Sequence, residues 1–169
     1  LTARGVVELN LVAQDLTGYG YDQRPRASLA GLLEALDRVE GLRWIRVHYL
    51  YPRPFPRALL RALGESDKVV PYVDMPLQHI SDPMLRRMNR GRPRRFVEKL
   101  LDDIRGAIPG VTLRTSFIVG FPGETDADFE ELCAFVQDQD FERVGVFKFS
   151  RAEGTPSFDM ARQVEPEVV

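Results

Sequence analysis

Cysteine is nearly absent from this sequence. Cys133 is the single cysteine among 169 residues, which excludes an internal disulfide framework and every CxxC type of metal site. It falls on the apolar stripe of a predicted helix, so we expect it to be buried and inert. Histidine is scarce as well, and His48 and His79 without nearby cysteine make a poor zinc site. We therefore predict no metal centre built from these residues alone.

Long apolar runs are also missing. No stretch approaches the roughly 18 residues that a membrane span requires, and the first residues lack a signal-peptide pattern, so we expect a cytoplasmic protein without a membrane partner. The formal net charge is only −2, and any nucleic-acid partner would therefore need a local basic patch. With 44% hydrophobic and 28% charged residues, the chain suits one globular domain.

Strand-like and helical patterns alternate along the chain. Helices are predicted from a Ser28 cap to Val39, around residues 59–63, from Pro83, over residues 96–104, and after a capping box formed by Thr125 and Asp128. The predicted strands lie at residues 6–12, 44–50, 72–77, 111–119 and 143–149. Such alternation is typical of parallel β/α units with right-handed crossovers.

Each predicted strand has one apolar and one polar face. In residues 111–119, for example, Leu113, Thr115 and Phe117 alternate with Arg114 and Ser116, and side chains with a period of two point to opposite faces. An open sheet with one solvated face is the alternative, but its helices would need both flanks. We predict instead an α/β fold, an incomplete parallel β/α (partial TIM-type) barrel of about five strands with flanking helices. The polar residues expected to converge on one shared interior pocket are Glu8, Arg46, Asp74, Arg114 and Lys148.

The carboxyl ends of parallel strands are where ligands bind in such folds. Each predicted end is polar, aromatic or rich in glycine, and Gly120 to Gly123 lets a backbone approach a ligand closely. A phosphate is one candidate there, and a plain strand-to-helix turn is another. Because Glu124, Asp126 and Asp128 would repel an anion, a neutral or cationic adenosine-like group fits better.

Six arginines are concentrated in the stretch RRMNRGRPRR. They predict either RNA contact through phosphates or the solvated rim of a turn between helices, and the sequence leaves both open. His79 is likewise open between a catalytic and a structural role, whereas His48 is expected to be a hydrogen-bonded interior residue. The arginines are Arg86, Arg87, Arg90, Arg92, Arg94 and Arg95.

Five ordered stretches resemble the radical S-adenosylmethionine (SAM) methylthiotransferases. They cover nearly all of the chain and read ELNLVAQDLTGYGYD, WIRVHYLYP, DMPLQHISDPMLRRMNRG, LRTSFIVGFPGETDADFEEL and GVFKFSRAEGTPSFDM. Relatives that modify tRNA carry LLGQN in place of LVAQD and PLQSGS in place of PLQHIS. The resemblance therefore favours the branch that adds a methylthio group to an aspartate of a small-subunit ribosomal protein, with a tRNA-modifying core as the alternative.

This resemblance implies a partial barrel whose interior holds SAM. Gln14 and Gln78 would line the methionyl and ribose side, and Arg114, assigned on charge, would neutralise a carboxylate. The remaining cofactor-binding residues that it implies flank the adenosine and are Ser116, Ile118 and Gly120. No catalytic residue is assigned.

The chain departs from the family pattern in its cysteines. The family carries two 4Fe–4S clusters, one on a CxxxCxxC loop and one on three cysteines of an N-terminal domain, and neither set occurs here. We therefore expect residues 1–158 to be a partial core barrel lacking its first β/α unit, and residues 159–169 to be a linker towards an absent C-terminal TRAM domain. Such a fragment would be inactive by itself.

Two further expectations concern partners and rivals. A severed barrel would expose a strand edge at residues 6–12, which invites self-association of the fragment. Outside the family, the rival interpretations are a non-catalytic module that binds RNA or the ribosome, and an ordinary barrel enzyme that uses phosphate substrates near Gly120.

Overall fold

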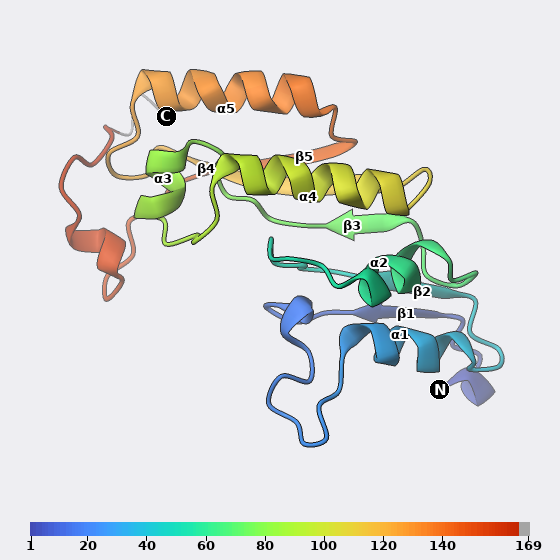
Figure 1. Cartoon of the computed structure of the whole chain (residues 1–169). Helices are drawn as coiled ribbons and strands as arrows, with labels where there is room; N and C mark the ends of the chain where they lie inside the picture. The colour runs from blue at the N-terminus through green and yellow to red at the C-terminus, as the bar shows by residue number, and fades with distance from the viewer. Residues whose placement is uncertain (166–169) are drawn as a thin grey trace.

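Five parallel strands form the framework of the molecule (Figure 1). The structure is a computed structural model, and it describes residues 1–165. Neighbours along the chain are neighbours in space, and all pairings are parallel. The strands are β1 (Glu8–Leu11), β2 (Trp44–Val47), β3 (Tyr72–Asp74), β4 (Thr112–Val119) and β5 (Arg143–Lys148). This arrangement confirms the predicted fold class. Of the expected linker, residues 166–169 lie outside the described part of the chain.

The strands divide into two ladders, β1-β2 and β3-β4-β5. A single parallel bridge between Ile45 and Val69 connects them, in which the Ile45 amide donates to the Lys68 carbonyl at 2.8 Å. Further along, the Leu50 amide donates to the Asp74 carbonyl at 2.9 Å. The two ladders are therefore one curved succession of strands with a thin seam at its centre.

Helices follow the strands in turn. Ser28 accepts a hydrogen bond from the Gly31 amide at 3.2 Å, and Thr125 forms a capping box with Asp128, so both predicted helix starts are confirmed. The α-helices are α1 (Leu29–Asp37), α2 (Arg57–Gly64), α3 (Asp82–Arg87), α4 (Arg94–Ala107) and α5 (Asp126–Gln139). Short 3-10 turns occupy η1 (Thr2–Arg4), η2 (Leu16–Gly18) and η3 (Pro156–Asp159).

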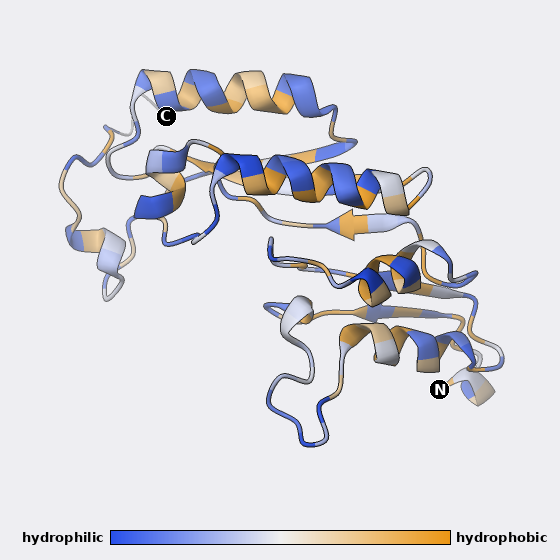
Figure 2. Cartoon of the chain, in the orientation of Figure 1, coloured by the Kyte–Doolittle hydropathy of each residue, from blue (hydrophilic) through white to orange (hydrophobic). Residues whose placement is uncertain are grey.

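The core lies between these helices and one face of the strands. On β4, Leu113, Thr115 and Phe117 are buried, whereas the intervening Arg114 is half-buried. Hydrophobic residues of α4 lie along its side nearer the strands (Figure 2), and Leu101 and Ile104 there are fully buried. Burying one large aliphatic side chain contributes about 1.5 to 3 kcal/mol, so the period-two pattern of the sequence decides which strand face meets the helices.

Two expectations about side-chain placement are wrong. Lys148 is exposed and shares its strand face with Val146, because residues two apart point the same way. Phe147, opposite Ile118, lies on the concave face instead and remains 56% exposed. Cys133 is exposed, because α5 buries only the narrow stripe of Leu132 and Phe135. One residue further on, a helical side chain has turned about 100° away from that stripe.

The outer strands leave apolar side chains uncovered. Val146 on β5 is 61% exposed, and Val12, just after β1, is 63% exposed. Within the described residues β1 pairs with β2 alone, so its other edge is open, and the self-association expected there stays a prediction. No helix in the described part of the chain is long and apolar enough to cross a membrane.

Candidate functional site

A cavity of about 320 Å³ opens on the concave side of the sheet, towards the carboxyl ends of the strands. All five strands, or the segments that directly follow them, contribute to its wall, and one residue comes from the loop between α3 and α4. The lining residues are Gln14, Tyr49, Leu50, Tyr51, Pro76, Gln78, Arg90, Arg114, Ser116 and Phe147. The volume lies at the lower end of the range of small-molecule sites.

An ion pair fixes one wall of this cavity. The Nη1 atom of Arg114 donates to Oδ1 of Asp74 at 2.7 Å, and Asp74 is only 2% exposed. This hydrogen bond raises the pKa of Arg114 above its usual value, so the guanidinium stays charged. The other N–H donors of Arg114 are on the cavity wall, because the Arg114 side chain lines the cavity. The wall therefore presents a fixed positive charge.

Polar side chains continue across the same concave face. His48 lies 3.4 Å from Asp74 through Nδ1 and 3.3 Å from Asn10 through Nε2, which confirms its interior, hydrogen-bonded role. Arg46 Nε donates to Glu8 Oε1 at 3.4 Å. The polar side chains of β1 to β4 therefore share one face, but the predicted convergence on one pocket is wrong in detail: of the five residues only Arg114 lines the cavity, and Lys148 on β5 lies on the other face.

Two of the five described non-glycine residues with a positive φ line the same cavity. Tyr49 and Gln78 both line it, and their φ angles are 55° and 71°, in the left-handed region that favours glycine. Gln78 is held there because its amide donates to the Ser116 carbonyl at 2.9 Å and its carbonyl accepts from the Ile118 amide at 2.8 Å. Strained non-glycine residues persist where the surroundings over-determine them, and they cluster at ligand sites.

The structure brings together four of the six residues predicted to bind a cofactor. Gln14, Gln78, Arg114 and Ser116 line the cavity. Gly120 lines a neighbouring apolar cavity of about 260 Å³ with Val119 and Phe129 among its walls. Ile118 is half-buried on β4, opposite Phe147 on β5, and is not among the residues that line this cavity.

Sequence reasoning missed several of the residues that line the cavity. Tyr49 and Tyr51 stand in the strand-end stretch YLYPRP, so their position at a carboxyl end was the available signal. Arg90 comes from a loop distant in sequence. Phe147 could have been found from parity, because it alternates with Val146 and Lys148.

The glycine loop after β4 is already filled by a side chain of the protein. Glu124 accepts hydrogen bonds from the Gly120 amide and, at 2.9 Å, from His79 Nε2. His79 is fully buried, and its Nδ1 accepts from the Ser81 amide at 3.0 Å. His79 is therefore a structural residue. A carboxylate occupies the place where a phosphate would lie, which argues against the phosphate-using enzyme.

Two of the six clustered arginines are bound by other groups of the chain. Arg94 pairs with Glu98 at 2.7 Å and Glu131 at 3.0 Å, and these hydrogen bonds raise its pKa. Arg87 donates to the Pro122 carbonyl at 2.8 Å and supports the glycine loop. RNA contact through the whole cluster stays a prediction, and two of its six members serve packing within the chain.

A SAM-like ligand and an iron–sulfur cluster fit this chain differently. The cavity offers a fixed cation, two amide side chains and aromatic walls, which suits a ligand carrying a carboxylate and a nucleoside. A 4Fe–4S cluster needs cysteine thiolates. The chain has one cysteine, exposed on α5, and among the described residues no three His, Cys, Asp or Glu side chains are grouped to hold a metal. The cluster therefore does not fit the residues present.

Sequence and fold correspond to a known class of proteins. The sequence model of the radical SAM superfamily matches residues 9–136, which extend from β1 into α5, and the chain belongs to this superfamily. Membership implies SAM and a 4Fe–4S cluster. A solved structure of the radical SAM methyltransferase TsrM from Kitasatospora setae matches the fold with a TM-score of 0.64 at 18% identity, over 86% of this chain and 28% of that one.

Two curated relatives carry the same name, ribosomal protein uS12 methylthiotransferase RimO. The one from Anaeromyxobacter sp. strain Fw109-5 is 56% identical to this chain over 169 residues, and the one from strain K is 55% identical over the same length. Each match covers 100% of this chain and 36% of the relative. The names agree with the ribosomal-protein branch that the sequence predicted, and the chain spans about a third of the length of these relatives.

Proposed function

We propose that this chain forms the SAM-binding wall of a cytoplasmic methylthiotransferase that modifies an aspartate of a small-subunit ribosomal protein. The observation that carries the proposal is the convergence of Gln14, Gln78, Arg114 and Ser116 on one cavity. The similarity to uS12 methylthiotransferases over the full chain supports the substrate class.

Each side chain has a role that follows from its chemistry. Arg114, anchored by Asp74, is placed to neutralise the carboxylate of the methionyl group. Gln14 and Gln78 offer amide donors and acceptors to the methionyl and ribose groups, and Ser116 adds a hydroxyl beside them. The aromatic ring of Phe147, which is 56% exposed, adds an apolar surface to this wall. When bound, SAM supplies the radical chemistry that removes hydrogen from an unactivated carbon.

The reaction needs groups that this chain does not contribute. Two 4Fe–4S clusters with ligands outside the chain complete the proposed enzyme, because the residues present cannot hold them. Residues 1–158 then act as part of the barrel, residues 159–169 as a linker, and the chain alone is inactive. The protein's own contribution is binding, orientation and exclusion of water.

The test is SAM binding by isothermal titration calorimetry with Arg114→Gln. Loss of a charge-assisted hydrogen bond is expected to weaken binding about 10- to 100-fold. Arg46→Gln is the matched control, because Arg46 lies on the same concave face and pairs with Glu8 but does not line the cavity. Equal affinity of the Arg114 variant and the unmodified protein would refute the assignment of the wall.

A further inference from the structure

A second cleft, of about 700 Å³, opens beside the candidate site. It lies between the loop that connects η2 to α1, the segment after β2 and the loop between α3 and α4. The residues that line it, here called the arginine–tyrosine cleft, are Tyr21, Tyr51, Arg53, Pro54, Arg90, Gly91 and Arg92. The cleft shares Tyr51 and Arg90 with the candidate cavity, and Arg90 and Arg92 with the six-arginine cluster, but neither of those sets contains Tyr21 or Arg53.

Aromatic rings and guanidinium groups alternate through the cleft. The Arg53 guanidinium carbon lies 5.7 Å from the ring centre of Tyr21 and 5.4 Å from that of Tyr51. Arg90 lies 5.7 Å from the Tyr51 ring, whose hydroxyl donates to the Arg90 carbonyl at 3.0 Å. Arg26 adds a further guanidinium 4.2 Å from Tyr21. These contacts hold flat cationic and aromatic groups together at one surface.

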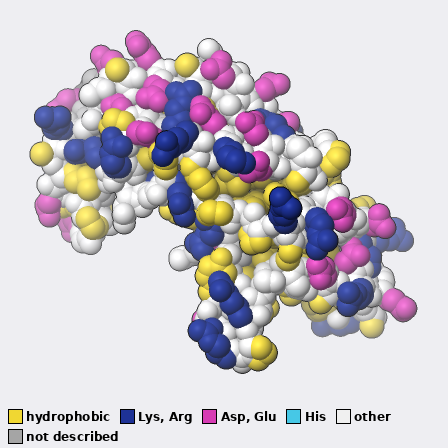
Figure 3. Space-filling view, viewed as in Figure 1, with side chains coloured by type: hydrophobic (Ala, Val, Ile, Leu, Met, Phe, Trp, Pro, Cys, Tyr) yellow, Lys and Arg dark blue, Asp and Glu magenta, His cyan; other side chains and the backbone are white. Residues whose placement is uncertain are grey.

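The charge of the cleft is of one sign. None of the described residues that line it is acidic; Asp15, which accepts a hydrogen bond from Arg53, is the nearby counter-charge. Figure 3 shows basic side chains following one another from the upper part of the molecule down to the projecting lobe, with few acidic side chains among the lower ones. Tyr21, in the loop between η2 and α1, is 47% exposed, so its ring is accessible.

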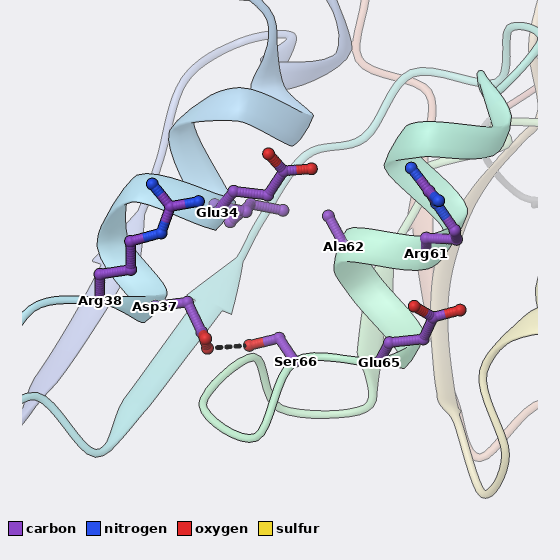
Figure 4. Close-up of a pocket in the computed structure, with 8 residues that line it drawn as sticks. Glu34, Asp37, Arg38, Arg61, Ala62, Glu65 and Ser66 are labelled. Atoms are coloured by element: carbon purple, nitrogen blue, oxygen red, sulfur yellow. Dashed lines mark hydrogen bonds between the residues drawn. The ribbon is translucent and has the colours of Figure 1, made fainter.

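The groove between α1 and α2 shows how different an ordinary charged surface is (Figure 4). There the acidic Glu34, Asp37 and Glu65 stand among Arg38 and Arg61 around a cavity of about 230 Å³. Positive and negative side chains offset each other, and no aromatic residue lines the groove in the described part of the chain. A polyanion would gain nothing there.

Arg53 supplies an independent sign of an absent partner. Its Nε atom is buried and has no hydrogen-bond partner among the described residues. A buried donor without an acceptor costs free energy. An anionic ligand in the cleft would supply an acceptor for this donor.

We propose that the arginine–tyrosine cleft binds a single-stranded segment of RNA. Guanidinium groups bind phosphates, and exposed bases stack on aromatic rings and on guanidinium planes. An acidic peptide would satisfy the arginines but would leave the tyrosine rings without a function. The proposal stands on this cleft alone and does not require the methylthiotransferase activity.

The test measures binding of fluorescein-labelled, single-stranded oligouridine to the protein by fluorescence anisotropy at a series of KCl concentrations, without SAM or reductant. The double variant Arg26→Gln/Arg92→Gln is expected to weaken binding at least about tenfold and to lower the slope of log affinity against log salt by about 1.4, or 0.7 for each phosphate contact. Arg90 is left intact because it also lines the SAM cavity.

Arg38→Gln/Arg61→Gln removes the same charge from the α1–α2 groove and is expected to change neither quantity. Tyr21→Leu keeps the charge and is expected to cost about tenfold in affinity with an unchanged salt slope, because only stacking is lost. Circular dichroism verifies that each variant folds, and an unfolded double variant leaves the Tyr21 result to decide.

Equal losses in the two double variants, or undiminished binding in the Tyr21 variant, would overturn the proposal. So would oligoglutamate that binds while oligouridine does not, which would identify an acidic peptide as the partner. SAM affinity, measured by calorimetry in the same Arg26/Arg92 variant, is expected to be unchanged. A failure of RNA binding is thereby distinguished from a failure of the SAM site.

Discussion

Asp74 and Arg114 stand directly opposite each other in the parallel pairing of β3 with β4, and their side chains form an ion pair of 2.7 Å on the concave face. The Asp74 side chain is buried and the Arg114 side chain is 37% exposed. A buried charge requires a partner of opposite charge. Each of these two residues therefore stabilises the charge of the other within the sheet. The positive charge at the candidate site therefore depends on a carboxylate that does not itself line the cavity.

Asp74→Asn is expected to lower the free energy of unfolding by about 1 to 2 kcal/mol, since a hydrogen bond between charged groups is weakened and Arg114 is partly screened by solvent. Urea unfolding measures this. Asp103→Asn is the control: its pair with Lys99 is exposed on α4, and its loss should change stability by no more than about 0.5 kcal/mol. Equal effects of the two substitutions would show that burial of the Asp74–Arg114 pair does not contribute to the free energy of unfolding.

Substitutions at Gln78 can separate the effect of backbone strain on stability from the effect of the side chain on SAM binding. Gln78→Gly and Gln78→Ala both remove the side-chain amide, but only glycine tolerates a φ of 71° without strain. Urea unfolding of the glycine variant is expected to show about 1 kcal/mol more stability than that of the alanine variant, whereas calorimetry should show the same loss of SAM affinity in both. A more stable alanine variant would contradict the strained conformation.

Asp128 gives the stability of the glycine-loop region a pH dependence. Burial pushes its pKa upward, but hydrogen bonds from Ser81 and Thr125 outweigh burial and hold the pKa below the usual value. Because the folded pKa is lower than the unfolded value of about 3.9, the contribution is complete above that pH and is lost as pH falls through the folded pKa.

Asp128→Asn is therefore expected to cost about 1 kcal/mol at pH 7 and to flatten the fall in stability below about pH 4. Thermal unfolding over a pH series measures both effects. Asp126→Asn is the matched control, because Asp126 is an exposed acid in the same first turn. A pH profile that is the same for both variants would exclude the assigned hydrogen bonds as its origin.

The sequence was sufficient for features that depend on local pattern. Period-two alternation on β4 predicted that Arg114 and Ser116 would share a face, and the Thr125 and Asp128 spacing predicted the start of α5. For β5 the prediction placed Lys148 on the wrong face. The same alternation, applied correctly, puts Lys148 on the face of Val146 and Phe147 on the concave face. These properties are encoded within a few residues, where steric and hydrogen-bonding rules act directly.

Features that depend on distant segments could not be predicted in this way. Glu124 filling the glycine loop needs His79, 45 residues earlier, to meet it, and Arg87 reaches a carbonyl 35 residues away. The exposure of Cys133 follows from how much of α5 the other elements cover. Each outcome is set by tertiary packing, for which residue spacing carries no signal.

The thin seam between the two ladders runs beneath the candidate cavity. Gln14 and Tyr49 belong to one side of it, and Gln78 and Arg114 to the other, while the Ile45–Val69 bridge and a few backbone bonds span the join. A molecule bound in the cavity contacts both ladders and so links them across the seam. Its arrival would stiffen the whole sheet, so that occupancy and the rigidity of the barrel wall rise together.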